Sequence, residues 1–472
     1  MISGKILRYH GWPEGKALGV AKKTAEQLLQ AGMEKDATLQ LLDAVLEDPE
    51  QFINDSRVSA LAEILIPEPT PDIQKIELRR DPVTYQTWGA ENIDAEAISQ
   101  MSHAMHLPVA IAGALMPDAH VGYGLPIGGV LATENEIIPY AVGVDIACRM
   151  RLSLYSEPTT VLTASQQRFE KALFAQTRFG LNAQWDKQDE PHHKVLDDSD
   201  WKATPLLRSL QEKARRQLGT SGSGNHFVEW GKVRLFIDDA LPGVKAGVYL
   251  ALLSHSGSRG IGARIADTYT TAATQSLPGL HESLRHLAWL SLESGTGSEY
   301  WLSMQLAGKF AKANHEIIHQ RVAAAAGIKA IASVENHHNF AWKETLANGS
   351  NAIVHRKGAT PANIGELGII PGSMGDAGYI VRGKGNGGAL NSASHGAGRA
   401  MSRKAAMKAI TKTMRDTYLR EHGVILLGGG VDESPQAYKD IESVIRSQDD
   451  LVEIIGKFTP IIVRMAEEQG QY

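Results

Sequence analysis

A proline-rich stretch, IPEPTPDIQKIELRRDP, divides this chain of 472 residues into a short and a long part. Its prolines stand at positions 67, 69, 71 and 82. Proline fixes φ and has no backbone N–H to donate, so such a stretch favours an extended linker over a helix or an inner strand. We therefore predict a small N-terminal unit over residues 1–65, a linker over 66–82 and one large domain over 83–472.

The two parts differ in their apolar pattern. Before the linker, AKKTAEQLLQAG and ATLQLLDAVLEDPEQF carry apolar residues at helical spacing, which predicts a small helical unit. After it, short apolar runs such as VAIAGALM and VYLALLS alternate with glycine-rich turns and amphipathic segments. That alternation is typical of a large mixed α/β domain, of the α+β class. We expect the polar stretch 183–203 to be a surface insertion.

Composition excludes several classes of protein. The chain has one cysteine, so it forms no intramolecular disulfide, and we expect a reducing, cytoplasmic location. It has no signal-peptide pattern at its start and no run of about eighteen apolar residues, so no membrane span is expected. A net charge of -5 excludes a wholly basic nucleic-acid binder. A local basic patch remains open, because residues 379–420 hold nine Lys or Arg against one acid, Asp416.

The lone cysteine, Cys148, stands in GVDIACRM, three positions after Asp145. Taken alone, a free cysteine is usually a small buried apolar residue. A carboxylate in the apolar setting AVGVDIAC, however, is costly unless it is paired or bound to a metal. Histidine also recurs in three polar or glycine-rich segments, GSGNHFVEW, LLSHSGSRG and VENHHNFAW, as His226, His255 and the pair His337–His338. Aspartate, cysteine and several histidines can hold two divalent ions, with the thiolate as a bridge.

Two other segments match sequence motifs of known functional sites. The segment His315–His319 fits H-E-x-x-H, in which two helical histidines bind zinc, but no third ligand follows at the spacings of the known protease classes. The segment Gly383–Gly388 fits G-x-G-x-x-G, but it lies late in the chain without a βαβ pattern or a suitably placed acid. We therefore expect neither a metalloprotease nor a Rossmann nucleotide site.

Seven segments occur in the order GVDIACRM, GSGNHF, HSGSRG, NHHN, HRKGAT, PGSM and SASHGAGRAMSR. With MPDAHVGYGLPIGG and DESPQAYKDI, they resemble the motifs of the RtcB family of RNA ligases. The resemblance runs from about residue 80 to the C-terminus and leaves the first 65 residues unexplained. It implies a ligase that joins an RNA 2′,3′-cyclic phosphate or 3′-phosphate to a 5′-hydroxyl, in RNA repair or tRNA processing.

The same resemblance implies GTP and two Mn²⁺ ions as cofactors and a histidine–GMP adduct on His395. It assigns the metal ligands to Asp145, Cys148, His226, His255 and His338, with Cys148 bridging the two ions. It places around GTP the residues Asn225, His226, Phe227, Glu229, His338, Asn339, Pro371, Gly372, Ser373, Met374, Gly378, Gly396, Ala397, Gly398 and Arg464. Arg399 and Arg403, one helical turn apart, suit binding of the RNA phosphate.

The chain departs from the common family pattern in several places. Ala147 and Arg149 stand where glycine is usual, and Gly378 replaces a hydroxyl expected near the nucleotide. Ser394 precedes the nucleophile where cysteine is frequent, and Arg464 stands near the end in place of a guanine-contacting lysine. These departures suggest a divergent paralogue. The resemblance does not identify its RNA or any activating protein partner.

Two other functions stay open at this point. A dinuclear metal-dependent phosphodiesterase would open cyclic-phosphate ends without sealing them. A non-ligating paralogue would bind RNA ends without chemistry, although an intact His395 and five intact candidate ligands argue against a retired site.

Overall fold

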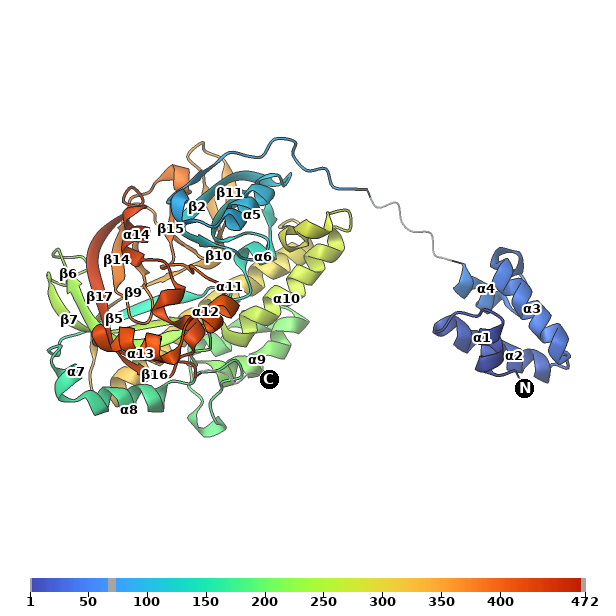
Figure 1. Cartoon of the computed structure of the whole chain (residues 1–472), viewed down its shortest axis with the longest axis horizontal. Helices are drawn as coiled ribbons and strands as arrows, with labels where there is room; N and C mark the ends of the chain where they lie inside the picture. The colour runs from blue at the N-terminus through green and yellow to red at the C-terminus, as the bar shows by residue number, and fades with distance from the viewer. Residues whose placement is uncertain (1, 67–73, 468–472) are drawn as a thin grey trace. The chain divides into compact units, whose positions relative to one another are not determined.

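The computed structural model describes residues 2–66 and 74–467 of the chain (Figure 1). The chain separates into two compact units, Met1–Gln74 and Lys75–Tyr472. Part of the proline-rich segment at which we predicted the boundary, residues 67–73, lies outside the described residues.

The N-terminal unit is helical, as its apolar spacing predicts. Its helices are α1 (Gly4–Tyr9), α2 (Lys16–Gln30), α3 (Lys35–Glu47) and α4 (Ser59–Leu65), with the 3-10 helix η1 (Pro49–Phe52) between the last two. In α2 the buried residues Ala21, Ala25 and Leu28 recur about every turn, and they pack with Leu42 and Leu61 in one apolar cluster.

The second unit is built on an eight-stranded sheet. The strands follow the order β13 (Leu367–Ile370), β14 (Gly378–Gly383), β17 (Val452–Met465), β6 (Phe227–Leu235), β7 (Gly247–Ser256), β5 (Arg149–Tyr155) and β9 (Ala330–His337), and β16 (Ile425–Leu427) pairs with β17. Neighbouring strands are antiparallel except for β16 and β17.

The two ends of this sheet are joined by one side chain. The Asn336 amide in β9 donates to the Ile369 carbonyl oxygen in β13 at 3.2 Å, and its oxygen accepts from the Ile369 N–H at 3.0 Å. Because an asparagine side chain offers both a donor and an acceptor, it can imitate a backbone pair and link two strands that do not form a ladder. The sheet is therefore close to a closed barrel.

A second, five-stranded sheet has the order β1 (Tyr85–Thr87), β2 (Ala110–His120), β3 (Ile127–Thr133), β11 (Asn351–Lys357) and β10 (Asn339–Thr345). Two short ladders join β12 (Ala359–Pro361) to β15 (Ser392–Ser394) and β4 (Glu136–Ile137) to β8 (Leu290–Ser291). Since β10 follows β9 after a single residue, the segment between them links the two sheets.

Helices cover the sheets. They are α5 (Ala95–Met105), α6 (Pro139–Val142), α7 (Val161–Ala164), α8 (Gln166–Gln176), α9 (Pro205–Gln217), α10 (Arg259–Ser276), α11 (Gly295–Ala325), α12 (Arg403–Ala409), α13 (Lys412–Glu421) and α14 (Ile441–Arg446). The 31-residue helix α11 lies beside α10 and buries residues all around its surface, among them Phe310 and Ile318 (Figure 1). A helix that is buried on most sides belongs to the core. The mixture of helices and sheets is the α+β class that the sequence predicts.

Two local findings bear on the sequence analysis. The stretch 183–203 lies at the surface, as predicted, since most of its residues are exposed or half-buried, but it is anchored there by four buried side chains, Trp185, Val195, Leu196 and Trp201, and it folds into η3 (Lys187–Asp189), η4 (Lys194–Asp197) and η5 (Ser199–Lys202). Its polar residues conceal a few large apolar anchors. Across the described ranges, no helix is both long and apolar enough to cross a bilayer.

Candidate functional site

The candidate site lies where four neighbouring strands of the eight-stranded sheet end or begin. His226 directly precedes β6, His255 is the penultimate residue of β7, Cys148 directly precedes β5 and His338 directly follows β9. Antiparallel pairing places the start of one strand beside the end of the next. The order β6, β7, β5, β9 therefore brings four side chains, far apart in the sequence, to one edge of the sheet.

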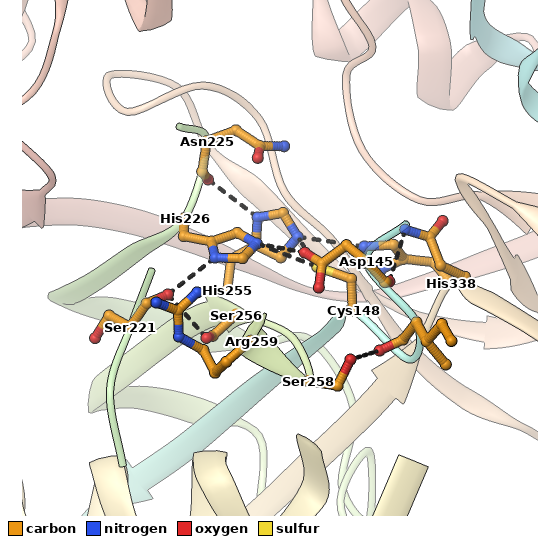
Figure 2. Close-up of polar contacts among 12 residues, drawn as sticks. Asp145, Cys148, Ser221, Asn225, His226, His255, Ser256, Ser258, Arg259 and His338 are labelled. Carbon is orange, nitrogen blue, oxygen red and sulfur yellow. Dashed lines mark hydrogen bonds and ion pairs between the residues drawn. The ribbon is translucent and has the colours of Figure 1, made fainter. Parts of the chain in front are cut away.

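The turn before β5 adds a carboxylate. The Cys148 N–H donates to the Asp145 carbonyl oxygen at 3.1 Å, which folds Asp145 back toward the thiol. Ala147 within this turn has φ of 57°, a left-handed value that suits glycine. The turn is held from outside by the Ser258 hydroxyl, 2.6 Å from the Ile146 carbonyl oxygen (Figure 2).

The donor atoms of five side chains form two triads that share the Cys148 sulfur (Figure 2). In the first triad, His226 Nε2 is 2.8 Å from Asp145 Oδ2 and 3.5 Å from Cys148 Sγ. In the second, His255 Nε2 is 3.1 Å from Cys148 Sγ and 3.2 Å from His338 Nε2. Within each triad, the donor atoms all lie within 4.8 Å of one another.

Backbone carbonyls orient two of the imidazoles. His226 Nδ1 is 2.9 Å from the Ser221 carbonyl oxygen, and His255 Nδ1 is 3.1 Å from the Asn225 carbonyl oxygen (Figure 2). A carbonyl oxygen only accepts, so Nδ1 carries the proton in both rings. In His255, Nε2 then presents its lone pair toward Cys148, as a metal ligand must. In His226, Nε2 faces the Asp145 carboxylate at 2.8 Å, where a divalent ion would lie between the two ligand atoms.

The electrostatics of the cluster favour a bound cation. Burial lowers the pKa of His255 to about 3 and that of His338 well below its usual value, so both rings are neutral ligands. Burial and the neighbouring Asp145 raise the pKa of the Cys148 thiol. A divalent ion would reverse the second effect by stabilising the thiolate. Neutral imidazoles, a thiol and a carboxylate in contact therefore fit a metal centre.

His395 lies beside this cluster. It directly follows β15, and its ring centroid is 4.9 Å from that of His338. Its Nδ1 is 2.6 Å from Asp118 Oδ2, which also accepts from the backbone N–H groups of His395 and Gly396 at 3.0 and 3.3 Å. Because a carboxylate accepts the Nδ1 proton, Nε2 keeps the lone pair that a nucleophile needs.

Sequence reasoning missed Asp118, although it lies in the recognised segment MPDAHVGYGLPIGG. The carboxyl group is fully buried, at 0% exposure. Burial raises its pKa, but the charge and hydrogen bond of His395, with Lys439 and His120, outweigh burial and hold the pKa below its usual value. The signal available in the sequence was an acid within an apolar strand, ALMPDAH, which is costly without a partner.

The H-E-x-x-H histidines belong to the core. His315 Nδ1 lies 2.6 Å from the Ser254 hydroxyl and its Nε2 lies 3.1 Å from the Ser256 carbonyl oxygen. His319 contacts the hydroxyls of Ser153 and Ser254, each at 2.8 Å. All four ring nitrogens thus have protein partners, so this helix offers no metal ligand.

Two further segments from the sequence analysis, HRKGAT with His355 and Gly383–Gly388, also have structural roles. His355 accepts from the Ile138 N–H at 2.9 Å and pairs through Nδ1 with the Leu131 carbonyl oxygen at 3.1 Å, so neither ring nitrogen is available for chemistry. The segment Gly383–Gly388 leads from β14 into the three-residue 3-10 helix η7 (Gly387–Ala389), which is not the strand–turn–helix of a Rossmann site.

Several residues proposed for GTP surround the cluster. Phe227 packs on the His255 ring at 5.6 Å between centroids, and it shares a core cluster with Met374. Glu229 is buried, and burial raises its carboxyl pKa well above the usual value. The Ala397 N–H donates to the Pro371 carbonyl oxygen at 3.0 Å, which joins the Pro371–Met374 and Gly396–Gly398 segments.

Glycine is required at one of these positions. A Cβ at Gly398, whose φ is 73°, would lie 2.1 Å from the Asp118 carbonyl oxygen. Because the backbones of Gly398 and Asp118 approach so closely, the segment after His395 packs against β2, the strand that carries Asp118.

Three of the remaining residues assigned to GTP make contacts within the protein. The Asn339 side chain bridges the Asp145 carbonyl oxygen at 3.2 Å and the Gly358 N–H at 2.7 Å, so it braces the site. The Ser373 hydroxyl donates to Asp376, next to Gly372 in the turn before β14. Gly378 is the first residue of β14 and pairs with Phe458 of β17.

Arg464 does not reach this side of the sheet. It pairs with Val228 in β6, and successive residues of a strand point to opposite faces, so it lies opposite Phe227 and Glu229. Its guanidinium stacks 4.1 Å from the Phe174 ring centroid. The assignment of Arg464 as a guanine contact is therefore corrected.

The two arginines after His395 differ in how far their side chains are bound by other residues of the protein. Arg399 donates to Glu433 at 3.2 Å and to the Asp432 carbonyl oxygen at 2.7 Å, so it is largely committed to the loop at η8 (Val431–Glu433). Arg403 also pairs with Asp432 and Glu433, but its side chain is 48% exposed. A Cβ at Gly224 would lie 3.1 Å from its guanidinium, which places Arg403 beside the loop of His226.

A cavity of about 700 Å³ lies next to the strand that carries Asp118. Its lining includes Ala119, His120, Arg399, Tyr438 and Lys439, and it includes none of the five candidate metal ligands. Acidic and basic side chains both line this cavity, so its charge favours neither anionic nor cationic ligands.

Comparison with known proteins gives the family. The family model described as "tRNA-splicing ligase RtcB" matches residues 100–206 and 193–466. The chain is 32% identical to the RNA-splicing ligase RtcB of Escherichia coli K12 over 419 residues, 81% of this chain and 96% of that protein. It is 30% identical to the tRNA-splicing ligase RtcB of Methanococcus maripaludis over 75% of this chain and 88% of the relative. For the RNA-splicing ligase RtcB of Mycobacterium tuberculosis the identity is 29%, over 73% and 95%. The matched residues include both candidate metal triads, His395 and Asp118, and the chain belongs to the RtcB family.

Proposed function

We propose that the protein is an RNA ligase of the cytoplasm that joins 2′,3′-cyclic phosphate or 3′-phosphate ends to 5′-hydroxyl ends with GTP, in RNA repair or tRNA processing. Its relatives are named RNA-splicing or tRNA-splicing ligases. The observation that carries the proposal is the pairing of His395 with Asp118 beside the two triads that share Cys148.

In the proposed first step, His395 Nε2 attacks the α-phosphorus of GTP. A P–N bond forms, the bond from the α-phosphorus to the bridging oxygen breaks, and pyrophosphate leaves. Asp118 holds Nδ1 at 2.6 Å and stabilises the positive charge that develops on the imidazole. A cyclic phosphate must first be opened by water, which leaves a 3′-phosphate and a free 2′-hydroxyl. GMP then passes to an oxygen of the RNA 3′-phosphate as the P–N bond to His395 breaks. Attack by the 5′-hydroxyl on the phosphorus of that RNA phosphate forms the phosphodiester, and GMP leaves while the hydroxyl loses its proton.

We propose that Asp145, Cys148 and His226 hold one divalent ion and that Cys148, His255 and His338 hold a second. Two such ions would neutralise phosphate charge, which is the main requirement of phosphoryl and nucleotidyl transfer. The choice of Mn²⁺ comes from the family resemblance, because cysteine and histidine bind Zn²⁺ more tightly.

The proposed GTP pocket keeps the residues that lie around the cluster on this face. Phe227 and Met374 would contact the base, and the carboxyl of Glu229, whose pKa burial raises, would donate to the base when protonated or accept from it. Gly378, Asn225 and Asn339, with Pro371–Ser373 and Gly396–Gly398, would shape the backbone around the nucleotide. We assign the RNA phosphate to Arg403, which is the more exposed of the two arginines, and a positioning role to Arg399.

The decisive experiment combines the purified chain with α-labelled GTP, Mn²⁺ and an RNA that bears a cyclic phosphate and a 5′-hydroxyl. We expect label on the protein and sealing of the RNA. His395→Ala should carry no label at any GTP concentration while its metal content is unchanged. The matched control is His192→Ala, a surface histidine whose side chain is 77% exposed, which should behave as the wild type.

Other outcomes would decide against the proposal. Opening of the cyclic phosphate without sealing or label would mean a metal-dependent phosphodiesterase. RNA binding without either reaction would mean a non-ligating RNA-end-binding protein. Label on His395→Ala would require a different nucleophile.

A further inference from the structure

Three aromatic rings from distant segments meet close to the candidate site. Tyr123 lies in the loop between β2 and β3, Tyr140 in α6 and His286 in η6 (Glu282–Leu287). The Tyr140 and His286 centroids are 4.6 Å apart, and Tyr123 lies 6.2 Å from Tyr140 and 5.7 Å from His286. We call these three residues the aromatic platform.

The platform faces solvent. Tyr123 is 66% exposed and His286 is also exposed, while Tyr140 is partly buried. Val121 and Val144, from the loops of Tyr123 and Asp145, are 39% and 49% exposed. An exposed cluster of large apolar side chains near a functional site commonly marks a binding surface.

The platform is held in place by backbone contacts. The Lys357 ammonium donates to the Tyr123 carbonyl oxygen at 2.5 Å. A Cβ at Gly124, whose φ is 70°, would lie 2.9 Å from the His286 carbonyl oxygen, so the two loops approach as closely as glycine permits. The Tyr123 ring takes no part in either contact. The backbone of the Tyr123 loop is therefore fixed against the segment of His286.

Lys357 connects the platform to the nucleophile. Its ammonium lies 5.1 Å from the Tyr140 ring centroid. The next residue, Gly358, packs on His395, because a Cβ there would lie 3.3 Å from His395 Cε1. The consecutive residues Lys357 and Gly358 thus contact the platform and His395, respectively.

We propose that the aromatic platform stacks a nucleobase of the RNA strand beside the ends that are joined. This inference rests on the proposed function. Single-stranded RNA is bound through bases that stack on Tyr, His, Phe or Trp, without regard to their sequence. The platform would hold an RNA end in register with His395 while accepting any base.

Fluorescence of 2-aminopurine tests the stacking directly, because stacking quenches this base. One RNA carries 2-aminopurine at its 3′-terminal nucleotide and another at its 5′-terminal nucleotide, and neither is given GTP. We expect quenching by the wild type for one of the two RNAs, which identifies the strand that the platform binds. Tyr123→Ala should lose the quenching, and Tyr123→Phe should keep it.

Kinetics supply the second readout. Tyr123→Ala should raise KM for the RNA by about 5- to 150-fold, the change that corresponds to about 1–3 kcal/mol per stacked base. An abasic nucleotide at the quenched position should remove the difference between Tyr123→Ala and the wild type. Labelling of the protein by GTP should not change. Tyr9→Ala, which removes a 91% exposed tyrosine from the N-terminal unit, is the matched control.

The outcomes separate this inference from the proposed function. If the wild type seals RNA but neither RNA is quenched, or if Tyr123→Ala and His286→Ala match it in every readout, the platform binds no base. An increased KM for GTP in the labelling step would show that the platform serves the nucleotide cofactor, and it would also overturn the inference. If the wild type neither labels nor seals, the proposed function fails, whereas quenching that depends on Tyr123 would still support base stacking.

Discussion

Replacing Asp118 by asparagine tests how the protein prepares His395. Asparagine keeps the size of the side chain and one acceptor oxygen, which can still bond His395 Nδ1 and the two backbone N–H groups. It removes the negative charge opposite the imidazole. The carboxylate oxygen Oδ1 has no hydrogen-bond partner among the described residues, so the new NH₂ group would be buried there without an acceptor.

The expected effect follows from these contacts. A hydrogen bond to a charged group contributes about 1.5–3 kcal/mol and a neutral one about 0.5–1.5 kcal/mol, so the change costs about 1–2 kcal/mol. As the imidazole gains positive charge in the step to the adduct, that loss raises the barrier. The rate of labelling by GTP should fall about 5- to 30-fold. If the amide turns its NH₂ group toward Nδ1, the proton moves to Nε2 and the loss will be larger.

The assay is the single-turnover rate of adduct formation from α-labelled GTP at saturating Mn²⁺. Metal content and the affinity for GTP should match the wild type, because Asp118 belongs to neither triad. Asp197→Asn, at a side chain that is 60% exposed, is the control. A wild-type labelling rate in Asp118→Asn, with folding intact, would refute the orienting role of this carboxylate.

Four further predictions concern metal binding and stability. Cys148→Ala removes the donor atom that both triads share, so the variant should bind at least one Mn²⁺ fewer in a titration and should no longer form the adduct. Normal binding of two Mn²⁺ ions would exclude a bridging thiolate. His315→Ala should lower the free energy of unfolding in urea by about 3 kcal/mol, through lost hydrogen bonds and a cavity, and leave metal content unchanged; loss of metal would revive the H-E-x-x-H motif. Ala147→Gly should raise the free energy of unfolding by about 1 kcal/mol, because φ at this position is 57°; an unchanged midpoint in urea would show that the turn relaxes. Burial lowers the pKa of Lys357 to about 7, so the folded chain binds fewer protons than the unfolded chain between about pH 7 and 10.5, and the stability of the wild type rises across that window. The stability that Lys357→Met gains over the wild type should therefore be greatest below pH 7 and should shrink toward pH 10, measured by denaturation at pH 6, 8 and 9.5; a gain independent of pH would contradict burial of the charge.

Much of the local structure could be predicted from the sequence. Helical spacing in AKKTAEQLLQAG and ATLQLLDAVLEDPEQF marked α2 and α3, because a buried stripe needs apolar residues at each turn. The surface position of the irregular stretch 183–203 was predicted correctly, but its few buried anchors, such as Trp201, were not, because polar residues predominate around them.

The candidate metal site was also accessible, though only as a set of residue types. Asp145 and Cys148 are close in sequence, and the three histidines were recognisable from their polar, glycine-rich settings. Nothing in the spacing alone showed that they converge, because Cys148 and His255 are 107 residues apart. The pairing order β6, β7, β5, β9 brings them together.

The sequence by itself determined which chemical groups this chain possesses, the order of its family motifs and the location of its most regular helices. The tertiary structure alone decided which groups meet. It joined Asp118 to His395 across 277 residues, occupied His315 with serine partners in the core, and turned Arg464 to the opposite face from Glu229. The physical reason is that helical periodicity is a local property, whereas strand pairing is long-range and a shift of one residue reverses the face of every side chain.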